Sequence, residues 1–372
     1  MNRNLDSLQR SGIRRFTNMA KEVSGCVMLT IGEPDFDTPQ PIKVAAMEAL
    51  NRNQTHYAPN QGTQELRNAI AAYETNRGMV CTPEQVLVTV GATGALFTAL
   101  LGILNPGDEV IIPTPAFSLY ETIVTVAGAK AVPLDIAKDD FQITEASLDA
   151  LLTEKTRAIV LNSPNNPTGT VLCAESLAVV KSRLRGSDTF IICDNVYNQL
   201  TYGACPDLSL DRELKDQLLL CQSFSKPYAM TGWRVGYLIG PQKVMDRLLL
   251  LHAAQVAAVP TFIQTACVTA LETDISEMRQ QYMERRDYCV ERLAAMGLRF
   301  PKPEGAFYIF VDIRPFGMDS EEFCTRLIRE AGVATVPGSC FGAEGFLRIS
   351  YCCSMENLHR GMDRLAEFLK SL

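Results

Sequence analysis

Short apolar runs recur in the middle of the chain and predict the strands of a buried sheet. Four of them span residues 86–90, 158–161, 190–193 and 218–221, and segments long enough for helices lie between them. Runs without polar alternation are typical of parallel strands that helices cover on both faces. Strands that alternate with helices indicate βαβ units, so we expect an α/β fold with a mostly parallel sheet.

The pattern changes after about residue 275. A charge-dense stretch at 277–292 predicts a long solvated helix, and further elements follow it: a strand at 306–313, a helix from about Ser320, a strand at 346–351 and an amphipathic helix to Leu372. We therefore expect two domains, a large one at 41–275 and a smaller α+β domain made of residues 1–40 and 276–372.

Composition narrows the class of protein. The 372 residues carry a net charge of −7 without a cluster of Lys and Arg, which argues against binding to nucleic acid or acidic membranes. The 12 cysteines are scattered without a C-x-x-C motif, as in a reducing cytoplasm, and 3 isolated histidines argue against a metal site. Residues 1–7 lack an apolar signal core, and Gly91 and Gly94 interrupt the one uncharged stretch that resembles a membrane span. We expect a cytoplasmic protein.

Lys226 is the first candidate for chemistry. It follows the apolar run at 218–221, and Pro227 behind it disfavours a helical backbone. The carboxyl ends of strands form the ligand crevice of an open α/β sheet. Desolvation there, and a nearby cation such as Arg234, would lower the pKa of the amine and free its lone pair. The alternative is an ordinary solvated lysine.

Two loops after predicted strands could bind a ligand. Gly91-Ala-Thr-Gly-Ala95 opens an apolar helix, so its backbone N–H groups and the hydroxyl of Thr93 could receive a phosphate, unless it is merely a glycine turn. Asn162-Ser-Pro-Asn-Asn-Pro-Thr-Gly169 is a rigid polar loop, or a simple turn.

Three further side chains stand at informative positions. Asp194 directly follows a buried strand, so its carboxylate needs a partner, either a protonated ring nitrogen or the start of a helix. Tyr197 could supply a phenol nearby. Arg348 lies on a predicted strand, where its guanidinium could hold a carboxylate by two hydrogen bonds or serve as an edge-strand charge.

Together these motifs resemble the class I/II aminotransferases, which are pyridoxal-phosphate enzymes of fold type I. The resemblance covers nearly the whole chain and is carried by these motifs: Ile31-Gly-Glu-Pro-Asp-Phe36, Thr55-His-Tyr-Ala-Pro-Asn-Gln-Gly62, Asn165-Asn-Pro-Thr-Gly169, Ser223-Phe-Ser-Lys226, Gly232-Trp-Arg-Val-Gly236 and Phe346-Leu-Arg-Ile-Ser350. One departure is Asn195, where many relatives carry an acidic residue.

The resemblance implies a role for each of these positions. Lys226 would form a Schiff base with pyridoxal 5′-phosphate and move the substrate proton. The phosphate would contact Ser223, Arg234, Ala92 and Thr93, together with Tyr57 across the interface of a homodimer. The ring would contact Phe117 by stacking, Asp194 through its nitrogen, and Asn166 and Tyr197 through its 3′ oxygen. The substrate carboxylate would bind Gly32, Asn166 and Arg348.

The resemblance also implies a reaction, the transfer of an amino group from an L-amino acid to a 2-oxo acid such as 2-oxoglutarate. Because neither the Ala92–Thr93 loop nor residues 259–264 carry a charge, we expect an aromatic or neutral donor. An aspartate-type aminotransferase and a β-eliminating C–S lyase on the same fold are the alternatives.

Overall fold

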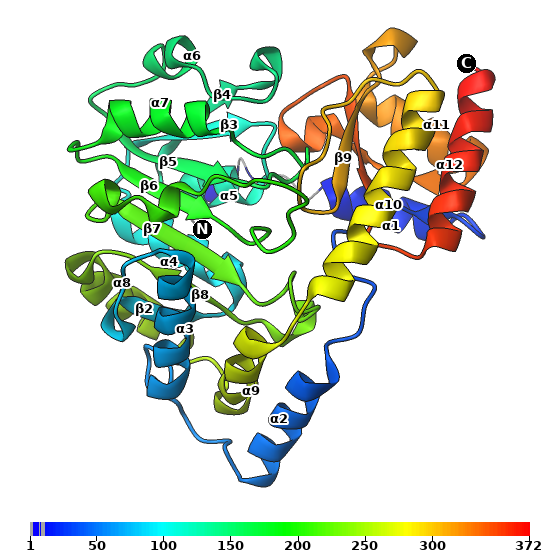
Figure 1. The fold of residues 1–372 in the computed structure, drawn as a ribbon. Helices are drawn as coiled ribbons and strands as arrows, with labels where there is room; N and C mark the ends of the chain where they lie inside the picture. Colours follow the sequence, from blue (N-terminus) through cyan, green and yellow to red (C-terminus); the bar gives the residue numbers. More distant parts are fainter. Residues whose placement is uncertain (1–2, 7, 9–11) are drawn as a thin grey trace.

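The computed structural model describes residues 3–6, 8 and 12–372, so part of the segment 1–7 lies outside the described residues. A large sheet flanked by helices lies beside a smaller α+β part (Figure 1). The order of the strands in the large sheet is β2 (Val86–Thr89), β8 (Gly236–Ile239), β7 (Leu218–Ser223), β6 (Phe190–Asp194), β5 (Thr156–Asn162), β3 (Glu109–Thr114) and β4 (Lys130–Asp135).

Strand direction largely follows the expectation. The neighbouring pairs from β7 to β4 are parallel, which confirms an α/β fold with a mostly parallel sheet. β8 is antiparallel to β7 and to β2. The parallel pairing expected for the run at 86–90 is therefore wrong, because the strand beside it runs in the opposite direction.

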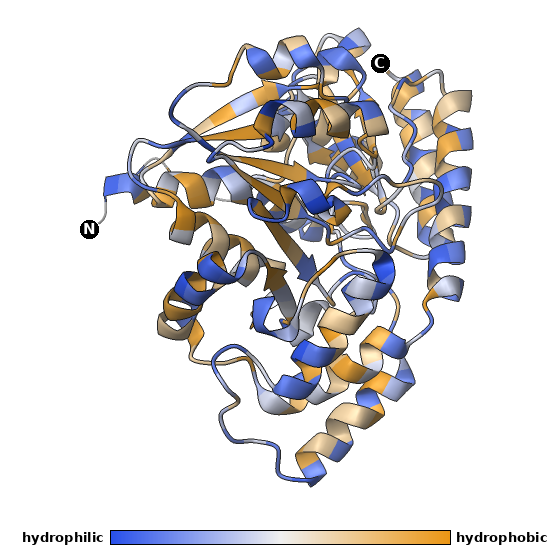
Figure 2. Ribbon diagram, turned by 60° about the vertical axis from the view of Figure 1, so that its left-hand side comes forward, coloured by the Kyte–Doolittle hydropathy of each residue, from blue (hydrophilic) through white to orange (hydrophobic). Residues whose placement is uncertain are grey.

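Helices cover both faces of the large sheet, and alternate residues of each strand face one side or the other. In β5, Ala158 and Val160 pack with α4 (Gly91–Ile103), α5 (Leu119–Val126) and α8 (Gln242–Val256). Ile159 and Leu161 face the opposite core, built with α2 (Gln40–Asn51), α3 (Gln64–Arg77), α7 (Ala174–Leu184) and α9 (Thr261–Glu272). Figure 2 shows the strands as an apolar layer between these helices. The short α6 (Glu145–Asp149) follows β4.

The smaller part has its own core. Its antiparallel sheet has the order β11 (Val336–Pro337), β12 (Phe346–Ser350), β9 (Tyr308–Asp312), and β1 (Val27–Met28) pairs with β10 (Val333–Ala334). Its helices are α1 (Gly12–Lys21), α10 (Ser276–Ala295), α11 (Ser320–Ala331) and α12 (Met355–Lys370). The amino-terminal segment thus packs with the carboxyl-terminal elements, and the division at residues 40 and 275 stays a prediction.

The expectation of a solvated helix at 277–292 is wrong for one face of α10. Tyr282, Arg285 and Cys289 are among its buried residues. Arg285 makes two hydrogen bonds, of 2.6 and 3.1 Å, with the carboxylate of Asp35. The density of charge in this stretch does not show that one of its arginines forms an ion pair with a distant part of the chain.

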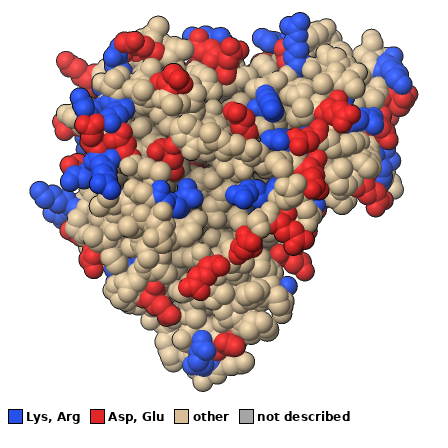
Figure 3. Space-filling model, in the orientation of Figure 1, with Lys and Arg blue, Asp and Glu red and all other residues tan. Residues whose placement is uncertain are grey.

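The surface and the thiols give further facts. Basic and acidic side chains are interspersed on the face drawn in Figure 3. All cysteines are free, and those at 193, 221, 267, 289, 324 and 352 are buried. Within the described ranges, no helix is both long and apolar enough to cross a bilayer. The same residues contain no group of three or more His, Cys, Asp or Glu suited to a metal ion.

Candidate active site

A pocket of about 240 Å³ brings together most of the side chains predicted from sequence. The predicted residues that line it are Gly32, Ala92, Thr93, Phe117, Asn166, Asp194, Tyr197, Ser223, Lys226, Arg234 and Arg348. A larger hollow of about 810 Å³, beside Met79 and Lys243, contains none of them, so size alone does not locate the chemistry.

Lys226 reaches the pocket from the turn after β7. Its side chain is partly buried, and its Nζ donates a hydrogen bond of 2.6 Å to the backbone oxygen of Gly32. Burial lowers the pKa of Lys226 from 10.5 to about 8, and the guanidinium groups of Arg348 and Arg234 act in the same direction. A fraction of this amine is therefore unprotonated and nucleophilic near neutral pH.

The start of α4 forms one wall of the pocket. The helix begins at Gly91, soon after β2, and no side chain of the described residues caps it, so the N–H groups of Ala92 and Thr93 lie at a free helix N-terminus. Gly91 has φ +67°, and a Cβ atom there would lie 3.0 Å from a guanidinium nitrogen of Arg234. Glycine adopts this backbone without strain and leaves room for the guanidinium.

Arg234 and Ser223 lie beside that helix start. Arg234 has a left-handed backbone with φ 53°, and its guanidinium donates a hydrogen bond of 2.8 Å to the backbone oxygen of Thr231. Ser223 is the last residue of β7, and its hydroxyl donates a hydrogen bond of 3.4 Å to the backbone oxygen of Val235. A guanidinium, a hydroxyl and free backbone N–H groups in one wall suit a phosphate group.

Asp194 ends β6 on another side of the pocket, and its side chain is buried. Its Oδ2 accepts a hydrogen bond of 2.6 Å from the hydroxyl of Tyr120. Within the described part of the chain, its Oδ1 has no hydrogen-bond partner. Burial raises the pKa of Asp194 from 3.8 to about 6, although the hydrogen bond from Tyr120 lowers it. No described helix begins at Asp194, which leaves a ligand nitrogen as the better partner for Oδ1.

Tyr197 and Tyr308 form a pair of buried phenols. Their hydroxyl oxygens lie 2.9 Å apart. Burial raises the pKa of Tyr308 to about 12, so both hydroxyls stay protonated near neutral pH. A Cβ atom at position 32 would lie 1.9 Å from the Tyr308 hydroxyl, which explains why this position of the pocket is Gly32.

Arg348 is 2% exposed on β12, a strand with neighbours on both sides. It is therefore no edge-strand surface charge. Its guanidinium donates to Oδ1 of Asn166 at 2.8 Å and to the backbone oxygen of Thr30 at 2.5 Å. The buried Nε has no partner among the residues that the structure describes. A guanidinium held against two neutral oxygens remains available to a carboxylate.

Tyr57 is the exception among the predicted residues. It lies outside the pocket, in the segment between α2 and α3, and its side chain is 92% exposed. A single chain therefore does not place it near the phosphate wall. Phe117, in contrast, lines the pocket.

The departure at Asn195 has a local explanation. Its side-chain N–H group donates to both carboxylate oxygens of Asp207, at 3.0 and 2.9 Å. An acidic residue at this position would repel that carboxylate. Asn195 therefore belongs to a buried polar network behind the pocket and not to its lining.

The lining residues that the sequence did not indicate include two phenols, Tyr120 and Tyr308. Tyr120 lies three positions after Phe117, in a stretch whose one recognisable signal is the aromatic ring of Phe117. Tyr308 lies in the predicted strand at 306–313. The alternation of apolar and polar residues along a strand does not distinguish a tyrosine of the core from one that lines a site. The only signal was their polar hydroxyl in an apolar setting.

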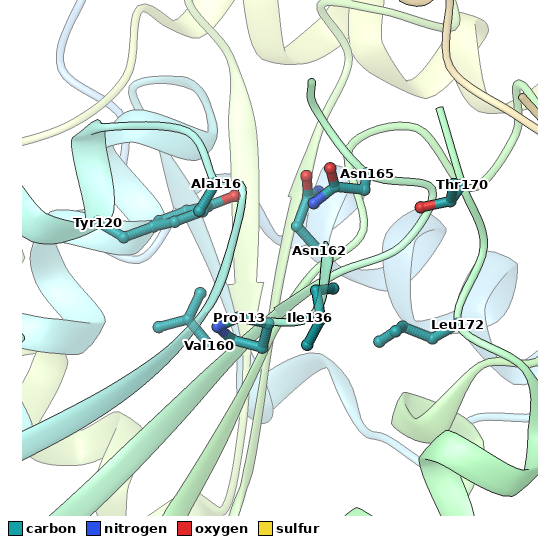
Figure 4. A pocket seen from close by; sticks show the side chains of 9 residues that line it. All are labelled: Pro113, Ala116, Tyr120, Ile136, Val160, Asn162, Asn165, Thr170 and Leu172. Atoms are coloured by element: carbon teal, nitrogen blue, oxygen red, sulfur yellow. The ribbon is translucent and has the colours of Figure 1, made fainter. Parts of the chain in front are cut away.

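A much smaller cavity of about 10 Å³ lies in the interior beside the pocket, with Tyr120 and Asn162 among the residues that line both (Figure 4). Its remaining lining residues include Asn165 and Thr170. This volume corresponds to about one water molecule, and the polar lining suits one.

The pocket fits a phosphorylated, nitrogen-containing aromatic cofactor that carries an aldehyde. An amine of lowered pKa, Lys226, can condense with the aldehyde. The unpartnered Oδ1 of Asp194 suits a protonated ring nitrogen, and the wall formed by Arg234 and the α4 start suits the phosphate.

Comparisons with known proteins agree with this chemistry. The family model for aminotransferase class I and II matches residues 24–365. The chain is 40% identical over 369 residues to a "Probable N-acetyl-LL-diaminopimelate aminotransferase" of Bacillus subtilis, covering 97% of this chain and 94% of that protein. It is 38% identical to aromatic-amino-acid aminotransferase 2 of Thermococcus litoralis, covering 98% and 97% of the two chains.

Solved structures share the fold. The structure of Thermus thermophilus aspartate aminotransferase with maleate matches with a TM-score of 0.94 and 36% identity, covering 99% of each chain. The names of these similar proteins refer to different amino donors, and the matched structure has the same fold as this chain.

Proposed function

The chain belongs to the class I and II aminotransferases and is a pyridoxal-phosphate-dependent transaminase, and on that premise we propose that Lys226 holds the cofactor covalently while Arg348 binds the carboxylate of the amino donor. One observation carries the proposal. A partly buried amine of lowered pKa and a buried carboxylate oxygen with no hydrogen-bond partner among the described residues belong to side chains that line one pocket.

Each group of pocket residues has its own role toward the cofactor or the donor. Ser223, Arg234 and the N–H groups of Ala92 and Thr93 would hold the phosphate, and Phe117 would stack on the ring. Asp194 would accept a hydrogen bond from the protonated ring nitrogen, while Asn166 and Tyr197 would orient the 3′ oxygen. Bound pyridoxal phosphate supplies an aldehyde and a ring that accepts electrons. Nζ of Lys226 would take up the proton from Cα of the donor.

Replacing Arg348 with lysine is expected to raise KM for the amino donor about tenfold or more. An ammonium group cannot reproduce two parallel hydrogen bonds to a carboxylate, and bonds to charged groups contribute about 1.5–3 kcal/mol each. Steady-state kinetics measure the effect, and absorbance titration should show unchanged cofactor affinity. Arg314→Lys, which alters an exposed arginine paired with Asp312, is the matched control. Equal kinetics for the Arg348 variant and wild type would exclude Arg348 as the anchor.

We propose that the donor has an aromatic or neutral side chain and that 2-oxoglutarate is the acceptor. Among the described lining residues, the only cations are Lys226, Arg234 and Arg348, and each of them already has a role. A donor panel with 2-oxoglutarate tests this by the glutamate formed. Aspartate as the fastest donor would identify the aspartate-type alternative. Pyruvate, ammonia and thiol released from a cysteine conjugate would identify a lyase.

We further propose a cytoplasmic homodimer in which Tyr57 of the partner subunit reaches the phosphate. Support comes from the exposure of Tyr57 and from exposed apolar residues of the neighbouring α2, such as Met47 and Leu50. Tyr57→Phe is expected to weaken cofactor binding about tenfold, because one hydrogen bond to a charged group is lost. Sedimentation should give twice the mass of the 41.0 kDa chain. A monomer with full cofactor affinity would contradict the proposal.

A further inference from the structure

We propose that Tyr120 is a positioning residue for Asp194: its hydroxyl holds one carboxylate oxygen so that the other stays free for the ring nitrogen of the cofactor. This inference rests on the proposed role of Asp194. Nothing in the motifs or in the comparisons assigns a function to Tyr120.

The geometry at Tyr120 carries the inference. Its hydroxyl donates to Oδ2 of Asp194 at 2.6 Å, a short bond of the charge-assisted type. Both side chains are buried, at 2% and 4% exposure, so water does not compete for this bond. The other oxygen, Oδ1, is buried without a partner among the described residues and belongs to a side chain that lines the pocket.

The direction of the hydrogen bond follows from its surroundings. Burial and the neighbouring carboxylate raise the pKa of Tyr120 well above its usual value, so the phenol remains protonated and donates. The other titratable groups near Asp194 are Tyr197, Lys226, Cys193 of the same strand and Cys221 of β7. Burial keeps the second phenol and both thiols neutral. Lys226 is the remaining cation, and it comes from a different side of the pocket.

Tyr120 also contacts other residues on this side of the pocket. Its ring meets the ring of Phe117 edge to face, with centroids 6.1 Å apart. The side-chain N–H group of Asn162, which lines the small cavity with Tyr120 (Figure 4), donates to the backbone oxygen of Asp194 at 2.9 Å. Asp194 is thus held at its backbone by one residue and at its carboxylate by the other. A phenylalanine at position 120 would keep the ring contacts and remove only the bond to the carboxylate.

Tyr120→Phe is expected to shift the pH dependence of the cofactor-free protein. Because burial raises the pKa of Asp194 from 3.8 to about 6, its ionisation removes stability as the pH rises from 3.8 to about 6, and the loss is complete above that pH. Loss of the Tyr120 bond raises this pKa further, so the variant should continue to lose thermal stability between about pH 6 and 8, where wild type has levelled off. Its affinity for pyridoxal phosphate near pH 7 should fall about ten- to hundredfold.

Tyr228→Phe is the matched control, because Tyr228 is buried and lies outside the pocket. Pyridoxal phosphate is titrated into each cofactor-free protein and followed by absorbance. A double-mutant cycle adds Asp194→Asn, in whose background Tyr120→Phe should have little further effect. The inference would be overturned if Tyr120→Phe had the pH profile and cofactor affinity of wild type. It would also be overturned if Tyr120→Phe lowered the affinity as much in the Asp194→Asn background as in wild type. If wild type itself does not bind the cofactor, the proposed function fails instead.

Discussion

Lys226→Ala protein is expected to lose transamination, with kcat lower by about 10⁴-fold. The variant has no amine with which to hold the cofactor covalently and none to take the proton from the donor Cα. Positioned acid–base catalysis alone contributes about 10²–10⁴-fold, and the expectation lies at the upper end because both roles disappear together. Single-turnover assays with excess cofactor measure the loss.

A control separates this effect from the loss of any lysine. Lys215 is exposed beside the larger surface hollow, so Lys215→Ala should have wild-type kinetics. Lys226 is not part of the wall that would hold the phosphate. The Lys226→Ala protein should therefore still bind the cofactor, without forming a covalent bond to it. Retention of more than a few per cent of wild-type activity by Lys226→Ala would show that another group does this chemistry.

Asp194→Ala is expected to lower kcat/KM by two to four orders of magnitude. Removal of one partner of a fully buried charge pair costs about 3–5 kcal/mol, and each factor of ten corresponds to about 1.4 kcal/mol. The ring nitrogen would lose its proton, and the ring would accept electrons less readily. Steady-state kinetics give the size of the effect, and the absorbance spectrum of the bound cofactor should change as well.

Glu74 provides a matched control for a buried carboxylate. It is 1% exposed and accepts a hydrogen bond of 2.5 Å from Tyr237, much as Asp194 does from Tyr120, but it lies outside the pocket. Glu74→Gln should therefore change thermal stability while the spectrum stays as in wild type. Similar spectra for the Asp194 variant and wild type would show that the ring nitrogen of the cofactor does not contact Asp194.

Local sequence signals located the elements that carry the site. The apolar runs locate β6 and β7, so the sequence placed Asp194 at the end of one strand and Lys226 in the turn after the other. The helix start at Gly91 was visible because an apolar helix follows a β-branched strand. Such features depend on neighbouring residues and can be interpreted without knowledge of the fold.

Contacts between distant segments could not be predicted in this way. The bond between Tyr120 and Asp194 joins residues 74 positions apart, and the pair Tyr197–Tyr308 spans 111 positions. The buried face of α10 depends on Asp35, which lies 250 positions from Arg285. Propensity and periodicity contain no information on such pairs, because only the tertiary packing brings them together.

Reduction of the cofactor-loaded protein with borohydride, followed by peptide mapping, tests most directly whether Lys226 carries the cofactor. The reagent fixes an imine between amine and aldehyde as a stable bond. We expect the cofactor on one peptide, the one that contains Lys226, with loss of the visible absorbance. Attachment to any other lysine, or a protein that stays colourless with excess pyridoxal phosphate, would contradict the account.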